Sequence, residues 1–481
     1  MTTLVWFRQD LRVADNPALA AAREDGGGVV PVYIFAPEEE EIWRPGAAAC
    51  WWLHHSLDSL AADLSALGSR LVLRRSGNSL GELLALARDC GADRIVWNRR
   101  YEPLIRVRDT RVKEALREAG FAAHSFNGAL LHEPAAVKSG SGGAFQVFTP
   151  FWRRCLALPD PPAPVPAPRA LPVPARWPVS QTLADFQLLP VRDWCAGIRA
   201  AWLPGSAAAQ VKLDGFLRHS FADYAQSRNR PDLSGTSRLS PHLHFGEIGP
   251  RQVWHAARAA GSALSADWRG SQFLAELGWR EFAHHLLYHF PRLPGEALRA
   301  NFRSFPWKSD PPALRRWQRG ETGYPIVDAG MRELWQTGWM HNRVRMIAAS
   351  FLVKDLLLSW EDGARWFWDT LVDADLAANT LGWQWVAGCG ADAAPFFRIF
   401  NPGLQGAKFD PAGRYVRRWI PEIAKLPDQW LHQPWLAPPE VLRAGAVRLG
   451  RDYPERLVEH GAARAAALAA LSSITSSSVP T

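Results

Sequence analysis

The chain has 481 residues, of which 47% are hydrophobic and 21% charged, a balance that is typical of a folded globular protein and excludes a disordered or fibrous one. No apolar run reaches the roughly 18 residues of a membrane-spanning helix, and no basic-then-apolar leader precedes the strand-like residues 4–7. We therefore expect a cytoplasmic protein without a membrane partner. The net charge of +8 favours an anionic partner, with nucleic acid as the first candidate.

The first 130 residues alternate strand and helix patterns, which predicts an α/β domain with a doubly wound, Rossmann-like parallel sheet. The expected strands cover residues 4–7, 29–35, 70–73, 94–97 and 122–126, and helical stretches cover residues 51–67 and 80–89. Three glycines at 26–28 precede a strand instead of following one. They are therefore not a dinucleotide fingerprint, which requires a strand, glycines and then a helix.

A proline-rich connector is expected over residues 131–204, because the prolines between 159 and 178 exclude regular helix and inner strand. Helical patterns prevail from residue 205 to about 470 and predict an all-α second domain. Two domains agree with a chain that is too long for one core. The serine-rich residues 471–481 should form a disordered tail.

The cysteines give no indication of a functional site, whereas the tryptophans are unusually numerous. The five cysteines, Cys50, Cys90, Cys155, Cys195 and Cys389, are scattered without a C-x-x-C pair, so a zinc site or a disulfide framework is not expected. Of the 24 tryptophans, five precede residue 150 and 19 follow it. Indoles serve as core filler, as stacking platforms for bases or as redox relays, and so heavy a load in the second domain exceeds what core filling alone explains.

Two segments of the helical domain carry unusual combinations of side chains. Residues 235–241 place hydroxyl side chains around a glycine, which suits phosphate oxygens and equally suits a helix N-cap. In residues 273–282, the spacing of Glu276, Trp279 and Arg280 puts an acid, an indole and a guanidinium on one helix face. This face could bind a base and a phosphate, or it could be an ion pair beside a core tryptophan.

Two further segments of the helical domain also bring polar side chains close together. Asn342, Arg345 and Met346 share a helix face by their spacing. Asp373 and Asp375 could bind Mg²⁺, but no phosphate-loop lysine supports that, and an Arg–Asp pair across segments is the simpler interpretation. His284, His285 and His289 lack an acidic partner at a useful spacing, so we expect ordinary helix histidines and no metal.

Taken together, these motifs resemble the photolyase/cryptochrome family, most closely its class I cyclobutane pyrimidine dimer DNA photolyases. The matching stretches are residues 5–12, 15–19, 235–240, 276–282, 322–329, 338–346, 373–385 and 393–402. They follow one another in the family's order and span nearly the whole chain. The resemblance implies a flavoenzyme that repairs pyrimidine dimers in DNA under blue light.

The resemblance further implies FAD in the helical domain. It assigns the phosphates and ribitol to a first group of residues: Tyr224, Thr236, Ser237, Leu239 and Ser240. It assigns the rest of the cofactor site to Glu276, Asn342, Arg345, Asp373, Asp375 and Asn379, with Arg345 paired to Asp373 and Asn379 opposite flavin N5. Light-excited, reduced flavin lends one electron to the dimer and recovers it, so Glu276 and Asn379 would serve the reaction directly.

The substrate implied by the resemblance is damaged double- or single-stranded DNA with the lesion flipped out of the stack, as base-flipping enzymes require, photolyases among them. Its expected contacts are Trp279, Arg343, Met346 and Trp385, with Arg398 and Lys408 on phosphates. The family's electron relay to the surface falls on Trp383, Trp360 and Trp307. The resemblance also leads us to expect a monomer that associates with the nucleoid through DNA.

Three alternatives stay open. A cryptochrome-type blue-light photoreceptor shares the fold and flavin, but Asn379 is the photolyase-like choice and the chain ends soon after its last helix. A (6-4) photoproduct photolyase usually has histidine where this chain has Asn342. A plain DNA-binding protein would explain charge and tryptophans but not residues 373–383.

A second, light-harvesting chromophore is the remaining expectation. Folate-type members carry Asn-Glu before an Arg-x-Arg-Asp stretch, whereas here Leu104 and Ile105 precede residues 106–109. Burying the amide-like edge of a pterin against them would cost roughly 1–3 kcal/mol for each unpaired group. Residues 101–103 look closer to members that bind a deazaflavin. We therefore expect a deazaflavin or flavin, or no second chromophore, in place of methenyltetrahydrofolate.

Overall fold

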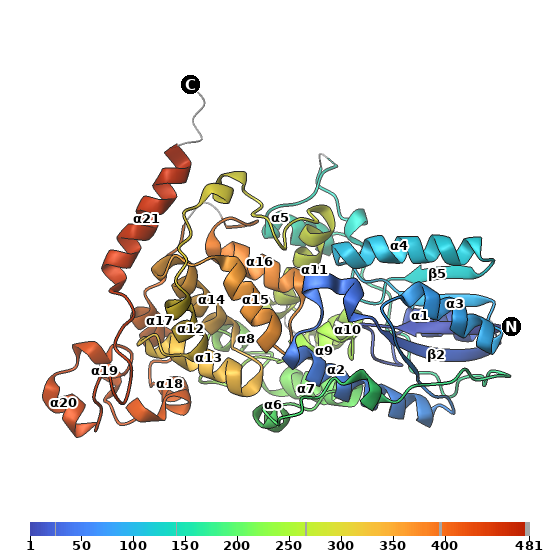
Figure 1. Ribbon diagram of the computed structural model, residues 1–481, viewed down its shortest axis with the longest axis horizontal. Coiled ribbons are helices and arrows are strands. Elements are labelled where there is room, and N and C mark those ends of the chain that lie inside the picture. Colours follow the sequence, from blue (N-terminus) through green and yellow to red (C-terminus); the bar gives the residue numbers. More distant parts are fainter. Residues whose placement is uncertain (25, 141, 265–266, 394–396, 477–481) are drawn as a thin grey trace.

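The computed structural model describes residues 1–24, 26–140, 142–264, 267–393 and 397–476. An α/β unit lies at the N-terminal end of the long axis, with a larger helical part beside it (Figure 1). The predicted fold class is confirmed. Residues 394–396 of the last predicted motif and residues 477–481 of the predicted tail lie outside the described residues.

The α/β unit is built on a five-stranded parallel sheet in the order β3-β2-β1-β4-β5. Its strands are β1 (Thr2–Phe7), β2 (Gly28–Phe35), β3 (Val72–Arg75), β4 (Arg94–Asn98) and β5 (Ala122–Phe126). Both faces of the inner strands are buried, as in doubly wound sheets. Val5 and Phe7 face the core with α1 (Pro17–Glu24) and α2 (Ala47–Ala66). Leu4 and Trp6 face the core with α3 (Ser79–Cys90) and α4 (Pro103–Glu118).

The connector is not a free linker. Its extended part runs along the edge strand β3, where the Leu73 amide donates to Ser180 Oγ at 2.9 Å and the Gln181 amide donates to the Leu73 carbonyl at 3.0 Å. The connector also contains two helices that we did not predict, α5 (Phe148–Leu156) and α6 (Ala196–Ala201). The helix α5 forms because Phe151 and Trp152 bury their rings against α11 (Gln272–His289).

The helical part is assembled around α11, α13 (Pro325–Thr337), α14 (Asn342–Ser350), α15 (Trp360–Thr370) and α16 (Leu376–Ala387). The helix α16 packs between α11 and α15, and α14 packs on α13 and α16. The other α-helices are α7 (Ser206–His219), α8 (Tyr224–Ser227), α9 (Ser240–His244), α10 (Pro250–Ala263), α12 (Pro311–Arg319), α17 (Pro402–Phe409), α18 (Arg414–Trp419), α19 (Asp428–Leu431), α20 (Pro439–Ala444) and α21 (His460–Ser476).

The predicted start of the disordered tail at residue 471 is wrong for the described residues. The helix α21 continues to Ser476 because Ala467 and Ile474 are buried against the core of the helical part. Figure 1 shows this helix along the outer side of the molecule, leading to the C-terminus.

The two parts are joined by buried polar contacts from the segment that follows β1. The Arg12 guanidinium, 1% exposed, donates to the carbonyls of Asp15, Gly128 and Gly246. A Cβ atom at Gly246, whose φ is +68°, would lie 2.2 Å from the Gln9 carbonyl oxygen. This junction therefore requires glycine, and it fixes the helical part against the sheet.

Candidate functional site

A cavity of about 600 Å³ opens between α14, α15 and α16. It brings together seven side chains that the sequence motifs had singled out: Asn342, Arg345, Met346, Asp373, Asp375, Asn379 and Trp383. Apolar walls are supplied by Phe367, Leu371 and Val386. The cavity thus combines apolar walls with charged and amide groups, which suits a heteroaromatic ring with polar edges.

An ion pair closes one side of this cavity. Arg345 Nη2 lies 2.8 and 3.0 Å from the two carboxylate oxygens of Asp373, and Arg345 Nε donates to the Met340 carbonyl at 2.7 Å. The side chain of Asp373 is only 3% exposed. A charge so deeply buried is stable only with its partner.

Asp375 is the second carboxylate of the cavity and the N-cap of α16. One oxygen accepts from the Ala378 amide at 2.8 Å, while the other lies 3.7 Å from His244 Nδ1 and 3.6 Å from His284 Nε2. Burial alone would raise the pKa of Asp375, but His284, His244 and Arg280 hold it well below its ordinary value. His284 is therefore not the ordinary helix histidine we expected, because a carboxylate from α16 faces it.

Asn379 lies on the same helix, one turn further. Its amide nitrogen donates to the Ala364 carbonyl at 3.0 Å, which fixes the orientation of the amide. Its oxygen is then the atom available to accept a hydrogen bond from an N–H group in the cavity.

The hydroxyl loop lies apart from the cavity lining. Thr236, Ser237 and Leu239 precede α9, which begins at Ser240, and Trp339 Nε1 donates to Ser240 Oγ at 3.4 Å. Tyr224 begins α8 and packs edge-on against Phe216 and Phe273.

The side chains predicted to contact DNA lie outside the cavity lining, except for Met346. Glu276 pairs with Arg228. Trp279 stacks on Phe148 with ring centroids 3.9 Å apart, whereas Arg280 donates to the Ala129 carbonyl and so is not held for a phosphate.

The remaining predicted DNA contacts form two cation–ring groups. Arg398 lies 5.6 Å from the Trp385 ring. Arg343 and Lys408 lie 4.5 and 5.3 Å from the Phe409 ring. The side chains of Arg398 and Lys408 are exposed, as phosphate contacts require.

The three relay tryptophans differ in burial. Trp383 lines the cavity and is 2% exposed, Trp360 is 3% exposed, and Trp307 is half-buried. Gly363, one turn after Trp360, faces the Trp383 ring so closely that a Cβ atom there would lie 2.0 Å from it. The backbone next to Trp307 pairs with the segment before α15 through Lys308 and Leu358. Two of the three indoles are therefore deeply buried, and only Trp307 reaches the surface.

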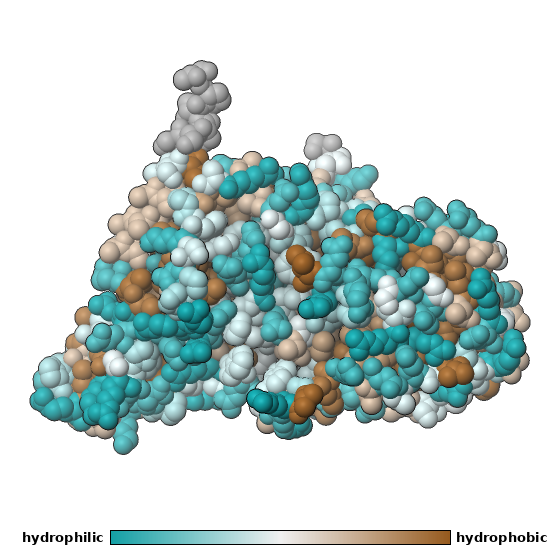
Figure 2. Space-filling model, viewed as in Figure 1, coloured by the Kyte–Doolittle hydropathy of each residue, from teal (hydrophilic) through white to brown (hydrophobic). Residues whose placement is uncertain are grey.

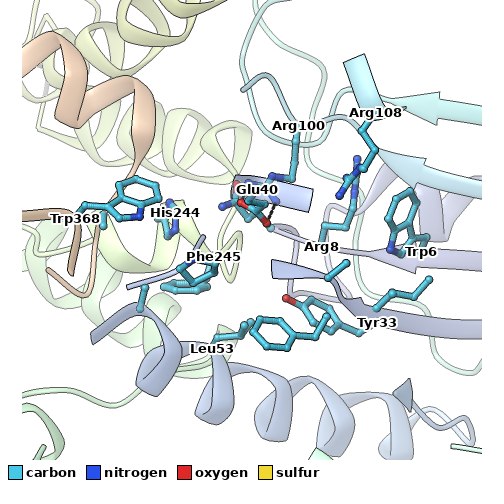
Figure 3. Close-up of a pocket in the computed structure, with 17 residues that line it drawn as sticks. Trp6, Arg8, Tyr33, Glu40, Leu53, Arg100, Arg108, His244, Phe245 and Trp368 are labelled. Carbon is cyan, nitrogen blue, oxygen red and sulfur yellow. Dashed lines mark hydrogen bonds and ion pairs between the residues drawn. The ribbon is translucent and has the colours of Figure 1, made fainter. Parts of the chain in front are cut away.

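A second cavity, of about 680 Å³, lies at the carboxyl ends of β1 and β2 (Figure 3). Open parallel sheets bind ligands beyond the carboxyl ends of their strands. Trp6 and Tyr33 come from the sheet and Arg8 directly follows β1, whereas His244, Phe245 and Trp368 come from the helical part. The sequence analysis missed this cavity, because its lining comes from segments up to 368 residues apart, from Trp6 to Ala374.

The second cavity is lined by arginines whose positive charges are paired with nearby glutamates. Arg100 pairs with Glu40 at 2.9 Å and with Glu102 at 2.7 Å, and Arg108 pairs with Glu39 at 2.9 Å. Arg8 and Arg108 lie 4.6 and 5.1 Å from the Trp6 ring. Stacked cations and an indole suit a flat aromatic ligand with polar edges.

A third cavity, of about 980 Å³, contains the residues on which the chromophore expectation was based. Leu104 and Ile105 line it together with Trp43 and Trp368. Glu41, Glu102 and Glu296 also face it, so polar partners are present that the local sequence did not indicate.

A buried carboxyl on α11 gives the first testable prediction. Glu281 Oε2 accepts from the amides of Leu131 and His132, and burial raises its pKa from 4.5 to about 7. The folded state therefore holds this proton more tightly than the unfolded state, and that stabilisation is lost as the pH rises from about 4.5 to 7. Glu281→Gln should raise the free energy of unfolding by about 1–3 kcal/mol at pH 8 and much less at pH 5.

Urea unfolding at both pH values measures this difference, with the exposed Glu114→Gln as the matched control. An equal effect of Glu281→Gln at pH 5 and pH 8 would contradict the assignment.

Comparisons with known proteins agree with this architecture. The family model described as the DNA photolyase domain matches residues 3–169, and the one described as the FAD binding domain of DNA photolyase matches residues 273–473. No helix among the described residues is long and apolar enough to cross a membrane, and those residues contain no group of three or more His, Cys, Asp or Glu side chains that could hold a metal ion. The chain belongs to the photolyase/cryptochrome family.

Individual relatives cover almost the whole chain. The deoxyribodipyrimidine photo-lyase of Agrobacterium fabrum is 49% identical over 98% of both chains. Cryptochrome-2 of Arabidopsis thaliana is 42% identical over 96% of this chain and 77% of its own. The crystal structure of a bacterial class III photolyase from Agrobacterium tumefaciens superposes with a TM-score of 0.95 at 48% identity, covering 99% of this chain and 98% of its own.

Proposed function

We propose that this protein is a deoxyribodipyrimidine photo-lyase that repairs cyclobutane pyrimidine dimers in DNA under blue light. The observation that carries the proposal is the cavity between α14 and α16, which gathers Arg345, Asp373, Asp375 and Asn379 in a chain 49% identical to a photo-lyase. The class I assignment stays a prediction, and the 48% identity to a class III photolyase favours class III.

The residues fit an FAD cofactor by their chemistry. The apolar walls suit the ring system, the Asn379 oxygen suits an N–H donor, and the hydroxyls of Thr236, Ser237 and Ser240 suit phosphate oxygens. Tyr224, Leu239, Glu276 and Asn342 complete the proposed site. Bound, fully reduced FAD would supply the light-driven donation of one electron to the dimer and take it back afterwards.

The chain's own residues would bind and orient the DNA. Arg398 and Lys408 are exposed cations for phosphates, and Arg343, Met346 and Trp385 would face the flipped lesion with Trp279. Ion pairing fixes Glu276 beside Arg228, where its carboxylate can accept from a base edge. In this proposal the protein acts as a monomer in the cytoplasm, at the nucleoid.

A repair assay tests the proposal directly. Duplexes with a single cyclobutane dimer or a single (6-4) photoproduct are incubated with purified protein in blue light and in the dark. We expect light-dependent loss of the cyclobutane dimer alone. Repair of only the (6-4) lesion, or of neither, would refute it. The second outcome, with retained FAD, would support a cryptochrome-type photoreceptor, which the 42% identity to Cryptochrome-2 makes the second candidate.

Trp279 provides a test of lesion binding. Trp279→Ala should weaken binding to dimer-containing DNA about tenfold, because one base-stacking contact is lost, and should weaken binding to undamaged DNA much less. Fluorescence titration of both duplexes measures this, with Trp194→Ala, which removes a half-exposed indole of the connector, as the control. An equal loss on both duplexes would make Trp279 a structural residue, whose stack on Phe148 explains it.

A second chromophore would occupy the cavity at the carboxyl ends of β1 and β2. We propose a deazaflavin or flavin there instead of methenyltetrahydrofolate. The archaeal photolyase from Sulfolobus tokodaii, 27% identical with a TM-score of 0.82, is described with two FAD molecules, which supports a flavin at a second site. Protein purified from its own host should release no folate in mass spectrometry, and stoichiometric folate beside FAD would overturn the proposal.

A further inference from the structure

Three cations and two indoles alternate in one row beside the cofactor cavity. Lys212 Nζ, on α7, lies 5.2 Å from the Trp202 ring centroid. The Arg238 guanidinium lies between two rings, 4.3 Å from Trp202 and 4.7 Å from Trp339. At the far end of the row, the Arg345 guanidinium lies 5.9 Å from the Trp339 ring centroid. All four distances are within the roughly 6 Å range of cation–π attraction. We call this row the cation–indole ladder.

The ladder joins two parts of the site that are distant in sequence. Its central cation, Arg238, belongs to the hydroxyl loop between Ser237 and Leu239. Its second indole, Trp339, donates through Nε1 to Ser240 Oγ in the same loop. Its last cation, Arg345, pairs with Asp373 in the cavity. One continuous set of contacts therefore connects the loop with the ion pair.

Two features of Arg238 are energetically unfavourable. Its φ is +52°, in the left-handed region that a residue with a Cβ atom adopts only when its surroundings hold it there. Its Nε is buried and has no hydrogen-bond partner among the described residues. Hydrogen bonds do not explain an arginine at this position, whereas the two rings do, because the guanidinium lies in the corner between two inclined indoles, whose planes differ by 67°, and its delocalised charge contacts both.

Both indole side chains are buried and make further contacts. Trp202 is 5% exposed and donates through Nε1 to the Thr337 carbonyl at 2.8 Å. Trp339 is 9% exposed, and its ring centroid lies 6.3 Å from that of Trp202. Buried contacts therefore fix the positions of both rings beside the guanidinium.

We infer that Arg238 is a positioning residue: clamped between Trp202 and Trp339, its side chain holds residues 236–240 in the conformation that accepts the phosphates of the cofactor. This inference rests on the proposed function in one respect, namely that this loop binds the phosphates of FAD. Because the ladder also contacts Arg345, the loop and the Arg345–Asp373 pair hold fixed positions relative to each other. The phosphates and the ring system of the cofactor would then bind at the two ends of one site.

The test separates the clamp from simple backbone strain. Glycine adopts a positive φ without strain, so Arg238→Gly relieves the backbone while it removes the clamp. We expect the dissociation constant of FAD for the apoprotein to rise about tenfold or more, as loss of a desolvated double cation–π contact implies. Thermal unfolding of the apoprotein should change little. Arg70→Ala, which removes a single cation–indole contact with Trp177 in the α/β unit, serves as the matched control and should bind FAD like the parent.

Arg238→Lys keeps the charge and provides the test if the glycine variant does not fold. A compact ammonium lacks the extended guanidinium that contacts both rings, so this variant should also bind FAD more weakly. FAD affinity equal to that of the parent in either folded variant would overturn the inference. A parent protein that does not bind FAD at all would instead refute the proposed function.

Discussion

Replacing Trp383 with phenylalanine should abolish the light-driven reduction of bound oxidised flavin and leave repair by chemically reduced protein largely intact. The side chain lines the cofactor cavity and is almost fully buried. Phenylalanine preserves most of the aromatic volume, but its ring is far harder to oxidise than an indole. The relay through Trp360 to Trp307 would lose its first member. Absorption spectra under blue light with an external reductant follow the reduction.

Trp317 offers a matched control for this experiment. Its ring centroid lies 6.2 Å from that of Trp383, and it is fully buried with Nε1 donating to the Ala348 carbonyl. Trp317→Phe should therefore perturb the packing around Trp383 without removing a relay member. Normal photoreduction in Trp383→Phe, or an equal loss in Trp317→Phe, would contradict the assignment of the relay.

Replacing Arg345 with leucine should lower the free energy of unfolding of the apoprotein by about 3 kcal/mol, because it leaves a buried carboxylate without its partner. FAD should also be lost during purification, since the free charge of Asp373 would remain in the cavity. Urea unfolding and the flavin-to-protein absorbance ratio measure the two effects. The double variant with Asp373→Asn should recover most of the stability, because no unpaired charge is left.

Arg365→Leu is the control for this prediction. Arg365 pairs with Glu361 and Asp362 on the exposed face of α15, with its own side chain 62% exposed. Pairs of that kind contribute little. If Arg345→Leu destabilised the protein no more than Arg365→Leu, the Arg345–Asp373 pair would not hold the cavity together.

The strands could be predicted to within two residues at each end, most closely where apolar runs are buried on both faces, as in β1, β2 and β4. The third strand shows the limit. Residues 70–73 were expected, whereas β3 covers Val72–Arg75. Its polar end is a strand because Arg74 and Arg75 pair with Ile34 and Phe35 of β2, a pairing that no local pattern reveals.

The lining of the cavity between α14, α15 and α16 could also be predicted only in part. Asn342, Arg345, Asp373, Asp375 and Asn379 lie on two short segments whose motifs are specific, and the structure brings them together. His244 and His284 beside Asp375 were missed, since each comes from a different helix. The contacts of Arg238 could not be predicted, because its two indoles lie 36 and 101 positions away in the sequence.

The connector along β3 has a consequence for the order in which the chain is made. The Val29 and Leu171 amides donate to the carbonyls of Pro172 and Leu67, so residues 171–181 complete the outer edge of a sheet that starts at Thr2. During synthesis, the first unit therefore stays open at that edge until this segment has left the ribosome. A fragment ending at residue 130 would present the bare backbone of β3 to other chains, the kind of edge that promotes aggregation. We therefore expect that a stable N-terminal fragment extends past residue 181.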